Sequence, residues 1–120
     1  VTDVIIFEGI NDIGTTRASL TMAQRLIEAY KIMVKKCRKA HLRVWLATIT
    51  PMKGSAYYSE EHEKCRQIVN EWIRTQQDAD GDPTNEQALH PQWKLSDNLH
   101  PNAVGYKEMG RYAADFFMKQ

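Results

Sequence analysis

The sequence predicts an α/β fold with a mostly parallel sheet. Two apolar runs, at residues 4–7 and 42–49, predict strands, and the second run is rich in β-branched and aromatic residues. Segments with helical periodicity follow each run, and buried strands that alternate with amphipathic helices are typical of layered α/β folds. A length of 120 residues is that of one domain, so we expect a single domain over residues 1–120.

The first half of the chain divides into a strand, a turn and a helix. The apolar run at 4–7 reads as a strand buried on both faces, and residues 8–14 are rich in turn formers. Thr21 is expected to begin a helix, because Gln24 stands three residues further on, as in a capping box. The apolar face of this helix is formed by Met22, Leu26, Tyr30, Val34 and Cys37.

The second half repeats the pattern. Pro51 stops the second strand, and Ser59 can cap a helix. The buried stripe of that helix is Cys65, Ile68, Val69, Trp72 and Ile73. Residues 76–87 are polar and predict a loop, and a final helix should start near Pro101. Two strands are too few for a sheet covered by helices on both faces, so the sheet is expected to be incomplete.

Composition excludes several classes of protein. Lysine and arginine number 16 against 15 aspartate and glutamate and form no basic stripe, so nucleic acid is not an expected partner. No apolar run is long enough to cross a bilayer, and the first seven residues are too short for a signal peptide and contain no lysine or arginine. Cys37 and Cys65 fall on apolar helix faces, which favours buried free thiols over a disulfide.

The strongest candidate for chemistry is the segment Asp97-Asn98-Leu99-His100-Pro101. A turn brings residues i and i+3 together, so the Asp97 carboxylate can accept a hydrogen bond from the His100 imidazole. That bond would fix the tautomer of a histidine base and stabilise its imidazolium form. The alternative is structural: Asp97 caps the last helix and His100 is an ordinary surface residue.

A second candidate, Asn11, lies just beyond the carboxyl end of the first strand, where open α/β sheets bind ligands. Its amide is a neutral donor that suits a developing oxyanion. The alternative is that Asn11 or Asp12 closes the turn with side-chain to backbone bonds.

The other three histidines are weaker candidates. His41 lies at a helix end, His62 in an exposed first turn and His90 beside a proline, which favours structural or solvated roles. A metal site from Asn11, His90, Asp97 and His100 matches no compact ligand spacing, so neither metal nor cofactor is expected.

Together, residues 4–14 and 97–106 resemble two signature blocks of the SGNH hydrolases, also called GDSL esterases and lipases. Gly9-Ile10-Asn11-Asp12 matches the G-x-N-D block, and residues 97–101 match the D-x-x-H-P block. The resemblance implies a three-layer, flavodoxin-like fold, with Asn11 as an oxyanion donor and Asp97 and His100 as members of a Ser-His-Asp triad. Residues 47–51, 57–59 and 66–74 also resemble bacterial arylesterases and acylhydrolases associated with plant polysaccharides.

The chain departs from this family in two places. The family's nucleophilic serine lies in a G-D-S block upstream of G-x-N-D, and no such block is present, so the nucleophile and the early strands are expected outside this chain. Ser55 and Ser59 do not have the strand-elbow context of a nucleophile, and Ser96 is too close in sequence to Asp97. Relatives would also carry a short strand between Arg74 and Leu89, where this sequence is polar.

The resulting hypothesis is a serine esterase that removes acyl groups, acetyl in particular, from carbohydrate or aryl esters through an acyl-enzyme. The alternative is a non-catalytic remnant that binds a carbohydrate or a protein partner, with Trp93 and Tyr57 as stacking residues. An open sheet edge predicts a homo-oligomer or association with a missing N-terminal segment. A secreted or periplasmic location is suggested by the resemblance alone.

Overall fold

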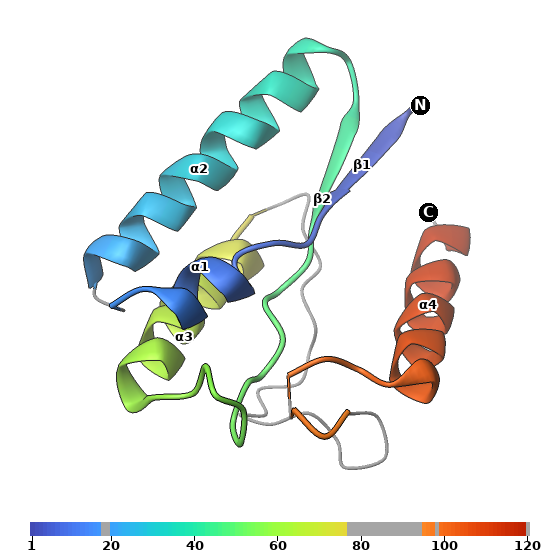
Figure 1. Cartoon of the computed structure of the whole chain (residues 1–120). Coiled ribbons are helices and arrows are strands. Elements are labelled where there is room, and N and C mark those ends of the chain that lie inside the picture. Colours follow the sequence, from blue (N-terminus) through green and yellow to red (C-terminus); the bar gives the residue numbers. More distant parts are fainter. Residues whose placement is uncertain (18–19, 77–94, 98, 120) are drawn as a thin grey trace.

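The computed structural model describes residues 1–17, 20–76, 95–97 and 99–119. Within these ranges the chain forms a mixed α/β structure with two strands and four helices (Figure 1). Their order along the chain is β1 (Asp3–Ile6), α1 (Ile10–Thr15), α2 (Leu20–Lys39), β2 (Arg43–Leu46), α3 (Glu60–Arg74) and α4 (Ala103–Met118).

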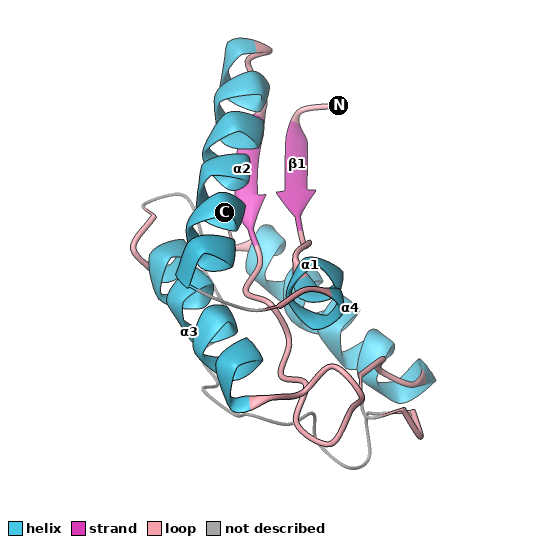
Figure 2. Cartoon of the chain, turned by 60° about the vertical axis from the view of Figure 1, so that its left-hand side comes forward, coloured by secondary structure: helices cyan, strands magenta, loops and turns pink. Residues whose placement is uncertain are grey.

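The two strands pair in parallel, as the sequence predicts. Asp3 lies opposite Arg43 and Ile6 opposite Leu46, and the arrows in Figure 2 point the same way. The second strand is shorter than the predicted run at 42–49, because ladder pairing ends at Leu46. One further bond, from the Ala47 N–H to the Ile6 carbonyl at 2.9 Å, closes the ladder. Both strands therefore end at the same edge of the structure.

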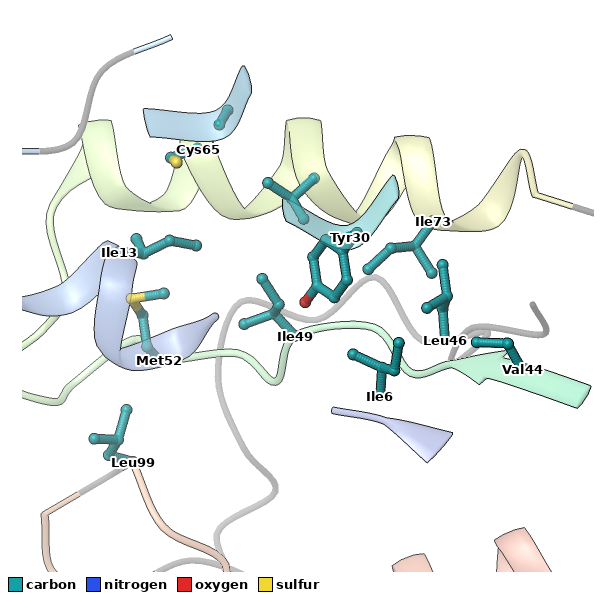
Figure 3. Close-up of a cluster of buried hydrophobic side chains, with 12 residues drawn as sticks. Ile6, Ile13, Tyr30, Val44, Leu46, Ile49, Met52, Cys65, Ile73 and Leu99 are labelled. Atoms are coloured by element: carbon teal, nitrogen blue, oxygen red, sulfur yellow. The ribbon is translucent and has the colours of Figure 1, made fainter. Parts of the chain in front are cut away.

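Side chains of β2 alternate between two packing environments, as a pleated strand requires. Val44 and Leu46 are buried in a cluster that also contains Tyr30 of α2 and Ile73 of α3 (Figure 3). Trp45 instead contacts two aromatic rings of α4, with centroid distances of 5.2 Å to Phe116 and 5.1 Å to Phe117. In Figure 1, α2 and α3 lie on one side of the strands and α4 on the other.

Tyr30 joins α2 to the end of β1. Its side chain is only 1% exposed, and its hydroxyl donates to the Glu8 carbonyl at 2.6 Å. Burial raises the pKa of Tyr30 to about 12, since the phenolate would be desolvated. The ring also stacks on Trp72 of α3 at a centroid distance of 5.9 Å. One side chain thus ties two helices and the exit of a strand together.

The helix boundaries confirm part of the sequence reading and correct the rest. Ser59 caps α3, accepting a bond from the His62 N–H at 3.0 Å, as predicted. The helix predicted to begin at Thr21 already includes Leu20, so the capping box is wrong. The segment predicted as a turn at 8–14 instead contains most of a short helix, α1. This helix begins at Ile10, immediately after the left-handed Gly9. The last helix begins at Ala103 and is capped by Asn102, whose Oδ1 accepts from the Gly105 N–H at 2.9 Å.

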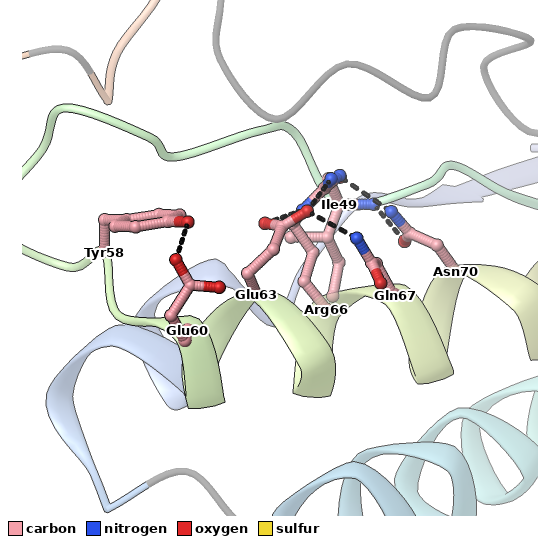
Figure 4. Close-up of polar contacts among 7 residues, drawn as sticks. All are labelled: Ile49, Tyr58, Glu60, Glu63, Arg66, Gln67 and Asn70. Carbon is pink, nitrogen blue, oxygen red and sulfur yellow. Dashed lines mark hydrogen bonds and ion pairs between the residues drawn. The ribbon is translucent and has the colours of Figure 1, made fainter.

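A buried polar cluster on α3 holds the chain after β2 (Figure 4). Asn70 bonds both backbone groups of Ile49: its Oδ1 accepts from the Ile49 N–H at 2.8 Å, and its Nδ2 donates to the Ile49 carbonyl at 3.0 Å. Arg66 donates to the same carbonyl at 3.0 Å and forms a buried ion pair with Glu63 at 2.7 Å. The Asn70 amide thus takes the place of a neighbouring strand for Ile49.

Three further predictions concern the cysteines, membrane segments and the loop. Cys65 is buried and Cys37 is partly buried, and both are free thiols, as predicted. Of the helices in the described ranges, none has the length and apolar character needed to cross a bilayer. The predicted loop at 76–87 lies outside the described residues beyond Gln76.

We expect Asn70→Ala to lower the free energy of unfolding by about 2–3 kcal/mol, because it leaves the buried Ile49 N–H without its partner. Chemical denaturation followed by circular dichroism measures this loss. Glu71→Ala, at the exposed neighbouring position on α3, is the matched control and should change stability by less than about 0.5 kcal/mol. Equal effects of the two substitutions would contradict the proposed importance of the Ile49 contacts.

Candidate active site

The carboxyl end of β1 leads into α1 through Gly9, whose backbone conformation strongly favours glycine. Gly9 has φ of 105°, in the left-handed region. A Cβ at this position would also lie 3.0 Å from Cδ1 of Ile49. The chain therefore turns directly from the strand into the helix. This turn places Asn11 in the first turn of α1, at the sheet edge where the sequence predicts a ligand site.

The Asn11 side chain is exposed and has a side-chain partner. Its Oδ1 accepts a hydrogen bond from the Tyr57 hydroxyl at 3.1 Å. The alternative in which this amide closes a turn onto the backbone is not what the described contacts show. With the oxygen engaged, the Nδ2 group is the part of the amide that is left to donate to another molecule.

Tyr57 is itself held against α1. A Cβ on Gly14 would lie 2.2 Å from both Cγ and Cδ2 of Tyr57, so the ring rests directly on the glycine backbone. His62 bridges the two segments: its Nδ1 contacts the Tyr57 carbonyl oxygen, and its Nε2 contacts the Thr16 carbonyl oxygen at 2.9 Å. The prediction of His62 as an exposed residue is thus corrected, because it is partly buried and joins α3 to the end of α1.

The Asp97 and His100 side chains meet as the turn geometry predicts. His100 Nδ1 lies 2.6 Å from Asp97 Oδ2, and the other carboxylate oxygen accepts from the backbone N–H groups of Leu99 at 2.9 Å and His100 at 3.0 Å. Asp97 does not cap the last helix, since Asn102 does so. The bond to Nδ1 leaves Nε2 of His100 available, and both side chains are about half exposed.

The core anchors this turn through Leu99. Leu99 is 9% exposed and belongs to the buried cluster, and Figure 3 shows it on the Met52 side of that cluster. The turn is also closed by a bond from the Leu95 N–H to the His100 carbonyl at 2.8 Å. Burying the residue between Asp97 and His100 leaves those two polar side chains at the surface.

Hydrogen bonding controls the charge of Asp97. Its bond to the His100 ring, followed by the two backbone N–H bonds, lowers the pKa of the carboxyl group to about 2. Asp97 is therefore a carboxylate across the whole neutral range. A carboxylate that is bonded to Nδ1 stabilises the imidazolium form of a histidine base when the ring takes up a proton at Nε2.

The remaining candidates from the sequence have other roles or lie outside the described residues. His41 follows α2 with φ of 58°, and His90 and Trp93 are among the residues that are not described. Ser55 donates to the Met52 carbonyl at 2.7 Å, and Ser59 caps α3. In the described part of the chain, no group of three or more His, Cys, Asp or Glu residues is placed to hold a metal ion.

Sequence reasoning named Asn11, Asp97 and His100 but missed the contacts that hold Asn11. The sequence suggests stacking as the role of Tyr57, and it assigns no role in the site to Gly14 or His62. A usable signal was the spacing of Gly14 three residues after Asn11, which puts both on one face of a helix. That signal required knowing that residues 10–15 are helical.

We expect His100→Ala to raise the pKa of Asp97 from about 2, but not fully to its ordinary value of 3.8, because two backbone bonds remain. Since the folded-state pKa is depressed, the stability that this carboxylate contributes is complete above its ordinary pKa. It is lost as the pH falls toward the folded-state value. Carboxyl ¹³C NMR titration measures both pKa values.

Asp3 provides the internal control for that titration. Its pKa is also lowered to about 2, but by Trp45, Thr2 and Arg43 at the sheet, so it should not respond to His100→Ala. An Asp97 pKa that stays at its original value in the variant would show that His100 does not govern this carboxylate.

We expect Gly14→Ala to destabilise the protein by about 1–3 kcal/mol, because the new methyl group overlaps the Tyr57 ring. Gly110→Ala is the matched control in α4, where an added Cβ meets nothing within 4 Å. It should stabilise the protein by about 0.5–1 kcal/mol, as alanine does in an open helix position. Thermal unfolding of the two variants measures the difference, and a stabilised Gly14→Ala would contradict the contact.

No curated protein sequence matches the chain. The family model for the GDSL-like lipase/acylhydrolase family matches residues 3–108, which include the Gly9 to Asp12 segment and the Asp97 to Pro101 segment. Because the match covers most of the chain, the protein belongs to the GDSL-like lipase/acylhydrolase family, a family of ester hydrolases.

Proposed function

We propose that this chain supplies the base, its carboxylate partner and an oxyanion donor to a serine esterase that works through an acyl-enzyme. His100 Nε2 takes the proton of the attacking serine and returns one to the leaving alcohol. Asp97 holds the ring and stabilises the imidazolium. Asn11 Nδ2 donates to the oxyanion of the tetrahedral intermediate.

The observation that carries this proposal is the bond between His100 Nδ1 and Asp97 Oδ2 at 2.6 Å. It selects the tautomer in which Nε2 is unprotonated and able to accept a proton. The low pKa of Asp97, about 2, keeps the partner charged at the pH where esters are cleaved.

The location of the site supports the same proposal. Asn11 lies in the first turn of α1, which follows β1 after a short connection, and the Asp97 turn is anchored through Leu99 in the cluster that also holds Ile13 of α1. The Asn11 amide is uncharged, so its N–H can stabilise an oxyanion without forming an ion pair with the substrate beforehand.

The nucleophilic serine is part of the proposal and is placed outside this chain. Ser55 and Ser59, two of the described serines, already bond backbone groups, and neither stands at a strand-to-helix elbow. Further strands that bring the serine would add to the two-stranded sheet and complete a three-layer, flavodoxin-like fold. Ile5 is 55% exposed and Phe7 is 42% exposed, which leaves apolar surface at and just beyond β1 for such an addition.

The proposed substrates are carboxylic esters, in particular acetyl esters of carbohydrates or of aryl alcohols. The test is made on a polypeptide that contains both this chain and the proposed nucleophilic serine. Its activity is followed by hydrolysis of a small aryl acetate and by labelling with a fluorophosphonate probe. We expect Asn11→Ala to lower kcat by about 10²-fold or more, and His100→Ala to lower it by a still larger factor. The physical reason is loss of a transition-state donor in one case and of the base in the other.

His41→Asn is the matched control for the histidine, since His41 is exposed and asparagine tolerates its positive φ. It should leave kcat unchanged. Absence of both turnover and probe labelling in the parent protein would overturn the esterase proposal. That result would favour the non-catalytic binding module instead. An unchanged kcat in Asn11→Ala would remove the oxyanion role alone.

A further inference from the structure

We infer that Tyr57 is a positioning residue for Asn11, holding the amide so that Nδ2 faces the substrate. This inference rests on the proposed oxyanion role of Asn11 and adds a residue to it. The contact is direct, because the Tyr57 hydroxyl donates to Asn11 Oδ1 at 3.1 Å. Tyr57 itself would not touch the reacting atoms.

An asparagine amide has two ends that differ in chemistry but hardly in shape. Rotation by half a turn about its last side-chain bond exchanges the acceptor oxygen and the donor nitrogen. An oxyanion is stabilised by the nitrogen end and repelled by the oxygen end. An exposed asparagine with no partner would sample both orientations, so a donor that binds the oxygen selects the productive one. The Tyr57 hydroxyl is such a donor.

The Tyr57 ring is well placed to hold that orientation, because it is itself fixed at several points. Gly14 lies three residues after Asn11 on the same face of α1, and the absent Cβ gives the ring its place against the helix. The backbone on either side is also held: the Tyr57 N–H donates to Ser55 Oγ at 3.2 Å, and the Tyr57 carbonyl contacts the His62 ring.

The adjacent tyrosine shows that the contact is particular to Tyr57. Tyr58 is also partly buried, but its hydroxyl donates to Glu60 at 2.9 Å on its own side of the loop. The Glu60 bond raises the pKa of Tyr58. The two residues therefore share a loop, a side-chain type and similar exposure, and only one of them contacts Asn11. Tyr58 is the natural control.

The test compares Tyr57→Phe with Tyr58→Phe in the polypeptide that carries the serine, using steady-state hydrolysis of an aryl acetate. We expect Tyr57→Phe to lower kcat about tenfold with KM nearly unchanged. The Asn11 amide loses its fixed orientation, and the oxyanion that it stabilises is present only in the transition state. Tyr58→Phe should change neither constant. Both variants should keep the unfolding midpoint close to that of the parent, since phenylalanine preserves the ring.

A double-mutant cycle with Asn11→Ala separates positioning from a general structural role. If Tyr57 acts through Asn11, Tyr57→Phe should cost nothing further in kcat once Asn11 is alanine. An equal cost in both backgrounds would overturn the inference, and so would an unchanged kcat in the single Tyr57→Phe variant. Loss of kcat in Asn11→Ala with no effect of Tyr57→Phe would overturn the inference while leaving the proposed function intact.

If Asn11→Ala has no effect on kcat, the oxyanion role fails first, and the inference about Tyr57 falls with it. A second measurement is independent of turnover: side-chain ¹⁵N relaxation of the Asn11 amide reports its rigidity. The amide should become more mobile in Tyr57→Phe and remain unchanged in Tyr58→Phe. Equal mobility in the parent and in Tyr57→Phe would contradict the inference directly.

Discussion

The structure depends on the way in which α3 holds the backbone of Ile49. Ladder pairing ends at Leu46, yet the chain continues in a buried path and needs partners for its N–H and carbonyl groups. Asn70 supplies both, and Arg66 adds a second donor to the carbonyl while its charge is neutralised by Glu63. Each member of this buried group is satisfied, which makes the interaction stabilising where an unpaired charge would be costly.

The effect of this contact extends to the site through the loop that follows. Ile49 lies against Gly9, where a side chain would meet its Cδ1, so the position of Ile49 limits the turn into α1. The same loop continues through Met52, which is fully buried, to Tyr57 on the face of α1. A polar contact on α3 thus helps to set both the entry of α1 and the ring that rests on it.

Sequence reasoning identified the strands, three of the helices and the Asp97 and His100 pair, because these features depend on residues close together in the chain. It placed the end of the second strand at residue 49, since the apolar run continues to that point, whereas Asn70 replaces the ladder beyond Leu46. It also missed α1, a helix of 6 residues that follows a glycine with positive φ and has no side-chain cap. The bond between Tyr57 and Asn11 spans 46 positions, and only the folded chain brings the two residues together.

The local character of the Asp97 and His100 pair has a consequence for how such a site can be assembled. Asp97 and His100 are only three positions apart in the chain, and closing so short a loop costs little chain entropy compared with joining distant segments. Relative motion between helices or between halves of the sheet carries the two side chains together as one body. In the proposed esterase, the distance that remains sensitive to such motion is the one from His100 to the nucleophilic serine. In the proposed esterase, this pair would therefore form within its own turn before the nucleophile is brought to it.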